Sequence, residues 1–317
     1  MRVIRGIHNV MNTDRGGTCT VGTFDGIHLG HQRVITTLVN RAIEFGTHPL
    51  VILFEPQPNE YFLKTEAPPR LTSFREKLVL LSDLGVQHVL CIRFDESTRS
   101  MAANSFIRTV LVDSLKIKHL VVGRDFKFGR QAKGNIGMLR SAAHDYEFTV
   151  EQVDDLEIQD TKVSSTRLRK AFECGDFSLV RSCLGRSYFI QGRVVKGRQL
   201  GTTLGVPTVN IPLNRSRSPL EGVFAVTIDG IERTHFGAAY IGSANSGSSN
   251  GPVLEVHIFD FDREVYGSEL RITFLKKFRA DRQFDDNSTL REYMLADIRQ
   301  IKQWIQATVT VLAPQNS

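Results

Sequence analysis

The sequence predicts an α/β chain of two domains, in which a doubly wound parallel sheet is followed by a small antiparallel barrel and a C-terminal helix. Three observations carry this prediction. The 317 residues exceed the usual size of a single hydrophobic core. From about residue 18 to residue 183, short apolar runs alternate with helical patterns. Beyond about residue 186, the rhythm changes to short strands separated by Gly and Pro.

The apolar runs of the first half are separated by segments of crossover length, as a parallel sheet requires. The expected strands are Thr18–Gly22, Leu50–Phe54, His88–Phe94, His119–Val122 and Phe148–Val153. Ser73 is followed three residues later by Glu76, a capping-box pattern that predicts the start of a helix.

The second half predicts a six-stranded antiparallel barrel. Its expected strands are Phe189–Val195, Thr208–Ile211, Val223–Ile228, His235–Ile241, Val253–Phe259 and Leu270–Leu275. Ser, Gly and Asn dominate Gly242–Gly251, which predicts a loop. Apolar residues then recur every three to four positions from Leu290 to Val309. We therefore expect a final helix whose apolar stripe packs on the barrel rather than carrying chemistry.

Composition limits the class of partner. The net charge of +6 and the pI near 9.2 favour anionic ligands. The basic residues are spread along the chain, which disfavours a nucleic-acid partner. No stretch of about 18 apolar residues is present, so we expect no membrane partner. The four cysteines form no Cys-x-x-Cys pair, which fits reduced thiols and a cytoplasmic location. The oligomeric state is left open.

The most informative segment runs from Thr20 to His31, where an expected strand leads through a Gly-rich turn into a helix. Glycines allow the backbone to approach a phosphate, and the N–H groups that begin a helix favour an anion. His28 and His31 would lie on one face and could both donate hydrogen bonds to phosphate oxygens. Two structural histidines or a zinc site are the alternatives, although no third ligand stands at the spacing of a zinc motif.

Two further segments carry candidate phosphate-binding groups. Ser164, Ser165 and Thr166 can cap the helix that follows them, and with Arg167 they would form a second phosphate clamp. On the residues alone, a capped helix start is the commoner interpretation. The segment from Gly192 to Ile211 joins Gly and basic residues to a Pro-Thr-x-Asn sequence. It fits a phosphate cradle with oxygen ligands for Mg²⁺, although Gly-rich hairpins are common in small barrels.

These segments resemble the bacterial bifunctional riboflavin kinase/FAD synthetase family over about residues 1 to 306. The Gly-x-Phe-Asp-Gly-x-His-x-Gly-His string looks like the signature of the His-x-Gly-His nucleotidyltransferase superfamily. Further segments that look like the FAD synthetase module are Phe54–Pro58, Arg70–Thr72, Arg75–Leu78, Val122–Gly129 and Val163–Arg169. The Pro-Thr-x-Asn segment, Gly222–Val226 and Leu254–Phe261 look like riboflavin kinase.

The resemblance implies an FAD synthetase domain at residues 1–184 and a riboflavin kinase domain at residues 185–317. The expected fold is nucleotidyltransferase-like (Rossmann-like) in the first domain and a kinase barrel in the second. The implied substrates are riboflavin, FMN and ATP, with Mg²⁺ as cofactor. In the first domain the FMN phosphate would attack the α-phosphate of ATP, and pyrophosphate would leave. In the second, the riboflavin 5′-hydroxyl would attack the γ-phosphate.

The resemblance also implies site residues. For catalysis they are His28, His31, Arg167 and Glu255, the last as the general base of the kinase. For ATP in the adenylyltransferase they are Gly22, Phe24, Gly26, Asp125, Ser164, Ser165 and Thr166. For its flavin they are Phe54, Pro56 and Pro58, although these prolines could equally be turn residues. For ATP in the kinase they are Gly197, Gly201, Gly205, Thr208 and Asn210, with Mg²⁺ on Thr208 and Asn210. For the flavin of the kinase they are Arg279 and Asp281.

The second half departs from the family pattern. Where the family reads Asn-Ile-Gly-x-Arg-Pro-Thr, this chain has Tyr240 in place of Asn and lacks the Arg-Pro-Thr. Asp281 stands in place of the family's Glu, and Gln283 in place of a basic residue. An FMN adenylyltransferase whose barrel only binds flavin is therefore an alternative. A flavin- or nucleic-acid-binding regulator without catalysis is another, which the intact histidine motif disfavours.

Overall fold

The computed structural model describes residues 1–197, 200–242 and 251–312. It divides into two compact units. The first comprises Met1–Pro68 and Phe74–Ser165, and the second comprises Pro69–Ser73 and Thr166–Ser317. The sequence predicts a domain limit after residue 184 because the sequence pattern changes there. This limit stays a prediction, since the two compact units are not defined by sequence pattern.

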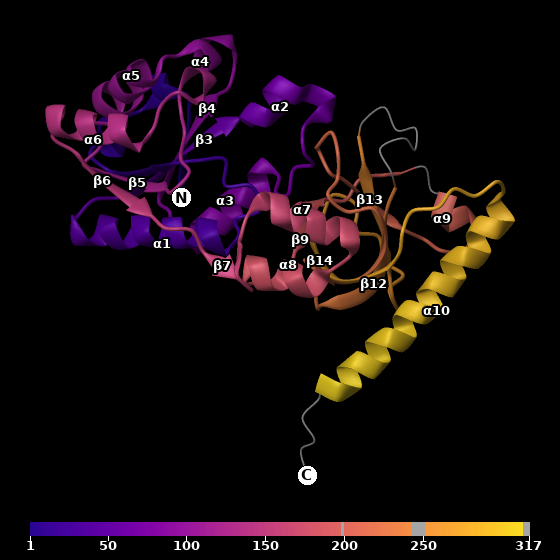
Figure 1. Cartoon of the computed structure of the whole chain (residues 1–317). Coiled ribbons are helices and arrows are strands. Elements are labelled where there is room, and N and C mark those ends of the chain that lie inside the picture. Colours follow the sequence, from indigo (N-terminus) through magenta and orange to yellow (C-terminus); the bar gives the residue numbers. More distant parts are fainter. Residues whose placement is uncertain (198–199, 243–250, 313–317) are drawn as a thin grey trace. The chain divides into compact units, whose positions relative to one another are not determined.

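A parallel sheet of six strands forms the centre of the first unit, in the order β1-β4-β3-β2-β5-β6 (Figure 1). The strands are β1 (Arg2–Arg5), β2 (Thr18–Val21), β3 (Pro49–Glu55), β4 (His88–Arg93), β5 (His119–Gly123) and β6 (Thr149–Val153). Five of them confirm the expected strands. The sixth, β1, has only two apolar residues between two arginines, so its sequence carries little strand signal. It pairs with β4 at the edge of the sheet.

Helices cover both faces of this sheet. They are α1 (Leu29–Glu44), α2 (Pro58–Leu63), α3 (Phe74–Asp83), α4 (Glu96–Ser100), α5 (Ala103–Phe106), a π-helical continuation (Ile107–Ser114) and α6 (Ile136–Asp145). Alternate strand residues such as Leu50 and Ile52 pack with α5 and α6, whereas α1 lies on the opposite face (Figure 1). A short hairpin, β7 (Glu157–Ile158) and β8 (Thr161–Lys162), follows β6.

The second unit contains the antiparallel barrel, with strand order β10-β13-β12-β11-β14-β9. The strands are β9 (Phe189–Arg193), β10 (Val209–Pro212), β11 (Gly222–Asp229), β12 (His235–Ile241), β13 (Val253–Ile258) and β14 (Glu269–Arg279). They confirm the six expected strands. A bridge between Val195 and Asn210 joins the first strand to the other edge of the sheet, which nearly closes the barrel. The loop expected at Gly242–Gly251 falls largely outside the described residues.

Four helices accompany the barrel: α7 (Ser165–Cys174), α8 (Phe177–Leu184), α9 (Leu200–Thr203) and α10 (Asn287–Leu312). The last confirms the expected C-terminal helix. Its apolar stripe divides into two parts. Ile301 and Ile305 pack with barrel residues. Ile298 packs against the same cluster, which confirms the expected packing for this part of the stripe. Leu290, Met294 and Ile298 also line a cavity, which the sequence did not predict.

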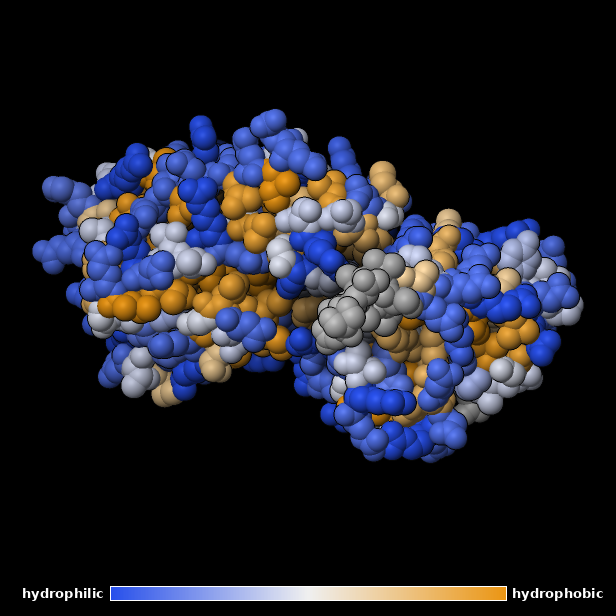
Figure 2. Space-filling model, turned by 90° about the horizontal axis from the view of Figure 1, so that it is seen from below, coloured by the Kyte–Doolittle hydropathy of each residue, from blue (hydrophilic) through white to orange (hydrophobic). Residues whose placement is uncertain are grey.

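The surface and the thiols agree with the composition. On the face drawn in Figure 2, hydrophilic residues are interspersed with hydrophobic patches. Within the described ranges, no helix combines the length and hydrophobicity needed to cross a bilayer. All four cysteines are free thiols, as the sequence predicts.

We expect the contact between α10 and the barrel to depend on Ile301, which is fully buried. The substitution Ile301→Ala should lower the free energy of unfolding by about 2–4 kcal/mol, because it removes buried methyl groups and leaves a cavity. Calorimetry of the full chain measures this as a lower transition temperature. The neighbouring exposed Gln303 provides the control, and an equal effect of Gln303→Ala would contradict the prediction.

Candidate active sites

The Gly-rich turn after β2 lies at the carboxyl edge of the parallel sheet, where strand order reverses between β2 and β5. The turn contains left-handed backbone at Phe24 (φ 45°), Gly26 (φ 86°) and Ile27 (φ 42°). Gly26 adopts this conformation without the steric cost that a side chain adds. The turn ends at His28, which is the N-cap of α1. The turn at the carboxyl end of β2 therefore places both histidines of the motif at the start of α1.

The two imidazoles lie against each other. Their ring centroids are 3.6 Å apart and their planes differ by 17°. The backbone N–H of His31 donates to Nδ1 of His28 over 3.2 Å. Because Nδ1 accepts this bond, a neutral His28 carries its proton on Nε2. That N–H group is then available to donate to a ligand.

Both histidines are held in the neutral form. Burial, opposed in part by the charge of Asp25, lowers the pKa of His28 to about 4. Burial lowers the pKa of His31 well below its ordinary value, and the neighbouring His28 and Lys77 contribute smaller effects of the same sign. Nδ1 of His31 is buried and makes no hydrogen bond to the part of the chain that the structure describes. At neutral pH the pair therefore offers polar N–H groups rather than positive charges.

Two side chains from other segments hold the backbone of the turn. Ser165 donates from Oγ to the carbonyl oxygen of Asp25 over 2.8 Å. Lys77, which is only 1% exposed, donates from Nζ to the carbonyl oxygen of Thr23 over 2.5 Å. Sequence analysis quoted Lys77 in a motif but gave it no role. A Lys among the leucines of α3 was the available signal, since lysines are almost never fully buried without a partner.

A cationic side chain that the sequence did not single out also lies near the histidines. Lys162 forms ion pairs with Asp125 and, over 2.8 Å, with Asp155. Its charge contributes to the lowered pKa of His28. Hydrogen bonding to Lys162 lowers the pKa of Asp125, so this carboxylate is ionised at neutral pH. Lys162 precedes the Ser164–Ser165 pair by only a few residues, but a single exposed Lys gives no sequence signal.

The remaining residues predicted for this half lie in the turn after β2, between the end of β3 and the start of α2, and around the start of α7. Phe24 is buried, its ring centroid lies 5.2 Å from that of His31, and an atom added at Gly22 would strike the Phe24 ring. Phe54 ends β3 and contacts Phe94 and Phe106. Pro58 is the first residue of α2, directly after Pro56 and Gln57, which agrees with the alternative turn role. Ser164 lies in the first unit, and Thr166 and Arg167 begin the segment of α7 that belongs to the second.

The second unit contains a cavity of about 440 Å³, within the usual range for small-molecule sites. Five of its lining residues form a row across five neighbouring strands. Paired directly in the register, they are Asn210, Glu255, Tyr240, Val223 and Arg279. Residues directly opposite one another in antiparallel strands share a face of the sheet. The pairing thus brings Asn210 and Glu255, which are far apart in the sequence, to one wall of the cavity.

The Gly-rich segment forms one end of this cavity. Gly197 and Gly201 line it together with Thr208 and Asn210. A side chain at Gly197 would strike the amide of Asn210, and one at Gly201 would strike the carbonyl of Val206 and approach Oγ1 of Thr208 to 3.0 Å. Both glycines are therefore required by close packing. Gly205 is not among the lining residues, and it has a left-handed φ of 76°. Its place in the structure is that of a turn residue after α9.

The other end of the cavity is formed by the segment after β14. Arg279 donates from Nε and Nη2 to the carboxylate of the buried Asp297 on α10, at 2.9–3.1 Å. Arg282 donates to Oη of Tyr293 over 2.6 Å. Asp281 is not among the lining residues. It accepts a hydrogen bond from Tyr240, which does line the cavity. Asp297 was missed by sequence analysis because the apolar stripe of its helix dominated the pattern.

His257 is a further lining residue that the sequence did not predict. Its Nδ1 lies 2.8 Å from the carbonyl oxygen of Pro207. A carbonyl can only accept, so Nδ1 carries the proton and the other ring nitrogen of a neutral His257 is an acceptor. The contact ties β13 to the residue before Thr208. The available signal was the i, i+2 spacing of Glu255 and His257, which places both on one face of a strand.

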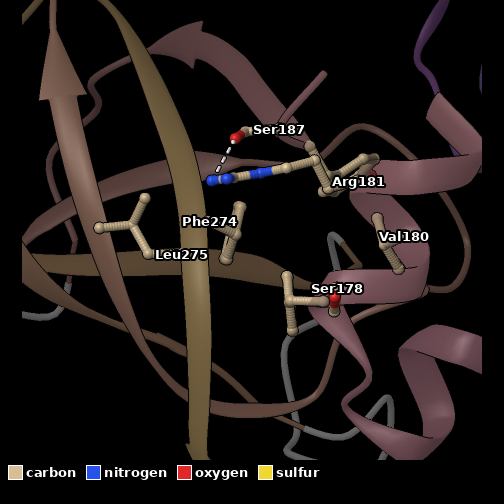
Figure 3. A pocket seen from close by; sticks show the side chains of 8 residues that line it. Ser178, Val180, Arg181, Ser187, Phe274 and Leu275 are labelled. Atoms are coloured by element: carbon tan, nitrogen blue, oxygen red, sulfur yellow. Dashed lines mark hydrogen bonds between the residues drawn. The ribbon is translucent and has the colours of Figure 1, made fainter. Parts of the chain in front are cut away.

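A second, smaller cavity of about 250 Å³ lies between α8 and β14 (Figure 3). Ser178, Val180 and Arg181 line it from the helix, and Phe274 and Leu275 from the strand. Arg181 reaches across to Ser187 and donates to it over 3.3 Å, as Figure 3 shows. Its volume falls below the usual range for a small-molecule site. The larger cavity is therefore the candidate site of this unit.

Comparison with known families agrees with the division of the chemistry between two halves. Residues 10–167 match the FAD synthetase family, and residues 184–305 match the riboflavin kinase family. Among curated proteins, the bifunctional riboflavin kinase/FMN adenylyltransferase of Pseudomonas fluorescens is 39% identical, with 94% of this chain and 96% of the relative covered. The Haemophilus influenzae protein of the same description is 38% identical, covering 95% and 98%.

A solved structure is similar over both units. It is described as a macrolide-efflux protein from Streptococcus pneumoniae and superposes with a TM-score of 0.74 at 25% identity, covering 96% of this chain and 98% of that one. The order of the parallel-sheet unit and the barrel unit therefore recurs in that protein.

The neutral histidines predict a pH-dependent stability. Between pH 4 and 6.5 the unfolded chain binds protons that folded His28 excludes, so the free energy of unfolding falls as the pH falls through this window. The contribution of His28 is on the order of 3 kcal/mol. The buried His31 adds an effect of the same sign. Unfolding temperatures from pH 7 to 5 should fall less steeply for His28→Gln than for the wild type. The 93% exposed side chain of His144 provides the control, and equal slopes for the wild type and His28→Gln would contradict the prediction.

Proposed function

The chain belongs to the bifunctional riboflavin kinase/FMN adenylyltransferase family, and from this premise we propose that its two activities are carried out by the two sites described above. The enzyme phosphorylates riboflavin to FMN and adenylylates FMN to FAD, with ATP as a substrate of both reactions. The observation that carries the assignment is the presence of one site of fitting chemistry in each unit. These are the stacked histidines at the start of α1 and the Asn210–Glu255 wall of the cavity.

In the adenylyltransferase site, the FMN phosphate oxygen attacks the α-phosphorus of ATP, the bond to the bridging oxygen breaks and pyrophosphate leaves. The reaction needs alignment and stabilisation of negative charge rather than a nucleophile from the protein. Nε2–H of His28 can donate to a phosphate oxygen, because Nδ1 is occupied by the His31 amide. The amide groups that begin α1 add further partial positive charge.

Further residues of this site have supporting roles. Lys77 and Ser165 hold the turn backbone through the carbonyls of Thr23 and Asp25. They fix the geometry of the turn, and Ser165 stays a candidate ATP-binding residue. Ser164 is a further candidate phosphate donor of this unit, and the phosphate-binding roles expected for Thr166 and Arg167, which belong to the second unit, stay predictions. Gly22, Gly26 and Asp125 complete the ATP site, and Phe54, Pro56 and Pro58 border the flavin.

In the kinase site, Glu255 accepts the proton of the riboflavin 5′-hydroxyl as that oxygen attacks the γ-phosphorus, and ADP leaves. Glu255 stands between Asn210 and Tyr240 in the row across the strands. Gly197 and Gly201 provide the close backbone approach that a phosphate needs. Arg279 and Asp281, at the other end, belong to the flavin side.

The lining residues also fit a magnesium ion. The hydroxyl of Thr208 and the amide oxygen of Asn210 are hard oxygen donors, and both residues line the cavity. When bound, Mg²⁺ neutralises charge on the ATP phosphates. No group of three or more His, Cys, Asp or Glu residues in the described ranges is arranged to hold a metal. This fits a metal held partly by substrate oxygens.

The two sites predict separable activities. His28→Ala or His31→Ala should reduce FAD formation from FMN by about 10²–10³-fold, the usual cost of one lost transition-state donor. FMN formation from riboflavin should stay nearly unchanged, because the kinase site lies in the other unit. Chromatography of the flavins formed with Mg-ATP measures both. His144→Ala is the matched control on an exposed histidine, and equal loss of both activities would refute the assignment.

The general-base role of Glu255 predicts the converse pattern. Glu255→Gln should lower kcat for FMN formation by about 10²–10⁴-fold, as expected for a lost general base. FAD formation from supplied FMN should remain. Glu264→Gln, at an exposed position of the same unit, serves as the control. Unchanged FMN formation in Glu255→Gln would show that another group accepts the proton.

A further inference from the structure

The two departures from the family pattern in the barrel meet in space. Tyr240 on β12 stands where the family has Asn, and Asp281 after β14 stands where it has Glu. The hydroxyl of Tyr240 donates to Oδ1 of Asp281 over 2.8 Å. The residues are 41 positions apart, so nothing in the local sequence links them. One substitution lengthens a side chain and the other shortens its partner.

The pair joins two walls of the kinase cavity. Tyr240 lines the cavity and stands directly opposite Glu255 in the strand register. Asp281 belongs to the segment Arg279–Phe284, and its Oδ1 also accepts from the backbone N–H of Arg282 over 2.8 Å. The bond therefore connects the strand next to the general base with the segment assigned to the flavin.

Two other residues of this segment bind side chains of α10. Arg279 is bound to Asp297, and Arg282 to Tyr293, both of which lie on α10. Those contacts fix the segment to the helix, whereas Tyr240 ties it to β12 in addition to its continuation from β14. Holding a short segment from both sides reduces the conformational freedom that it would lose when a ligand binds.

The Tyr240 hydroxyl also stays protonated at neutral pH. Burial, followed by the hydrogen bond to Asp281, raises the pKa of the Tyr240 hydroxyl above its usual value. The hydroxyl is therefore a hydrogen-bond donor at neutral pH. A hydrogen bond to an ionised acceptor is also stronger than one between neutral groups.

We propose that Tyr240 and Asp281 form a matched pair that positions the segment Arg279–Phe284 for riboflavin. The inference rests on the assignment of this cavity to the kinase reaction. The pair acts on flavin affinity, because it orders a binding segment and leaves the proton acceptor in place. An Asn at position 240 would not span the distance that the Tyr spans, and a Glu at position 281 would overreach toward the Tyr ring.

The test is a double-mutant cycle measured on the full chain with Mg-ATP and riboflavin. Tyr240→Phe and Asp281→Asn should each raise KM for riboflavin about tenfold, leaving kcat within about twofold and KM for ATP unchanged. The double variant should be no worse than either single variant. Tyr240→Asn should also raise KM, and adding Asp281→Glu should recover most of the loss. Quenching of riboflavin fluorescence gives the affinity independently of turnover.

Controls separate this proposal from the function on which it rests. Tyr266→Phe removes a hydroxyl from a partly exposed ring of the same unit and should have no effect. The unfolding temperature of each variant, measured beside that of the wild type, reports on correct folding of the barrel, and FAD formation from FMN reports on the other unit. Effects that multiply in the double variant, or an unchanged riboflavin KM in Tyr240→Phe, would overturn the pairing, as would a fall in kcat alone. If Glu255→Gln leaves FMN formation intact, the cavity assignment itself has failed.

Discussion

The register of strand pairing is the constraint on which the kinase site depends. Asn210, Glu255 and Tyr240 reach one wall of the cavity because they are direct partners across β10, β13 and β12. A slip of one residue would turn Glu255 to the opposite face, since successive side chains of a strand alternate. The buried side of each strand prevents this slip. The hydrophobic core of the barrel thus fixes the position of a charged group that is not part of it.

The adenylyltransferase site depends on burial in a different way. Taking the imidazoles of His28 and His31 out of water removes their charge, so in the proposed site a phosphate would meet neutral N–H donors and the amide groups of α1. The positive charge lies beside them, on the buried Lys77 and the half-exposed Lys162. Lys77 is directed to a backbone carbonyl rather than to the site itself. A rigid turn with fixed dipoles needs little reorganisation during the reaction.

The C-terminal helix combines packing and binding in one element. Ile301 and Ile305 complete the barrel core. Leu290 and Met294, which lie about two turns or more closer to the N-terminus of the helix, face the cavity. Asp297 lies between these two parts and holds Arg279. A substitution that destabilises this helix would therefore disturb Arg279, on the proposed flavin side of the cavity, through Asp297. The row containing Glu255 is held in place by strand pairing instead.

The sequence by itself determined the two folds and supplied the candidate site residues, because hydrophobic periodicity and short motifs are local properties. Strands β2 to β6, the barrel strands and the histidine motif were all predictable in this way, whereas β1 was too short and too polar. Lys77, Lys162, His257 and Asp297 could not be assigned from the sequence, because a single polar residue carries no signal until its neighbours are known. The hydrogen bond between Tyr240 and Asp281 is the clearest case. The sequence revealed two separate departures, and only the tertiary structure decided that they are one interaction, since contact between distant segments depends on how the strands pair and pack.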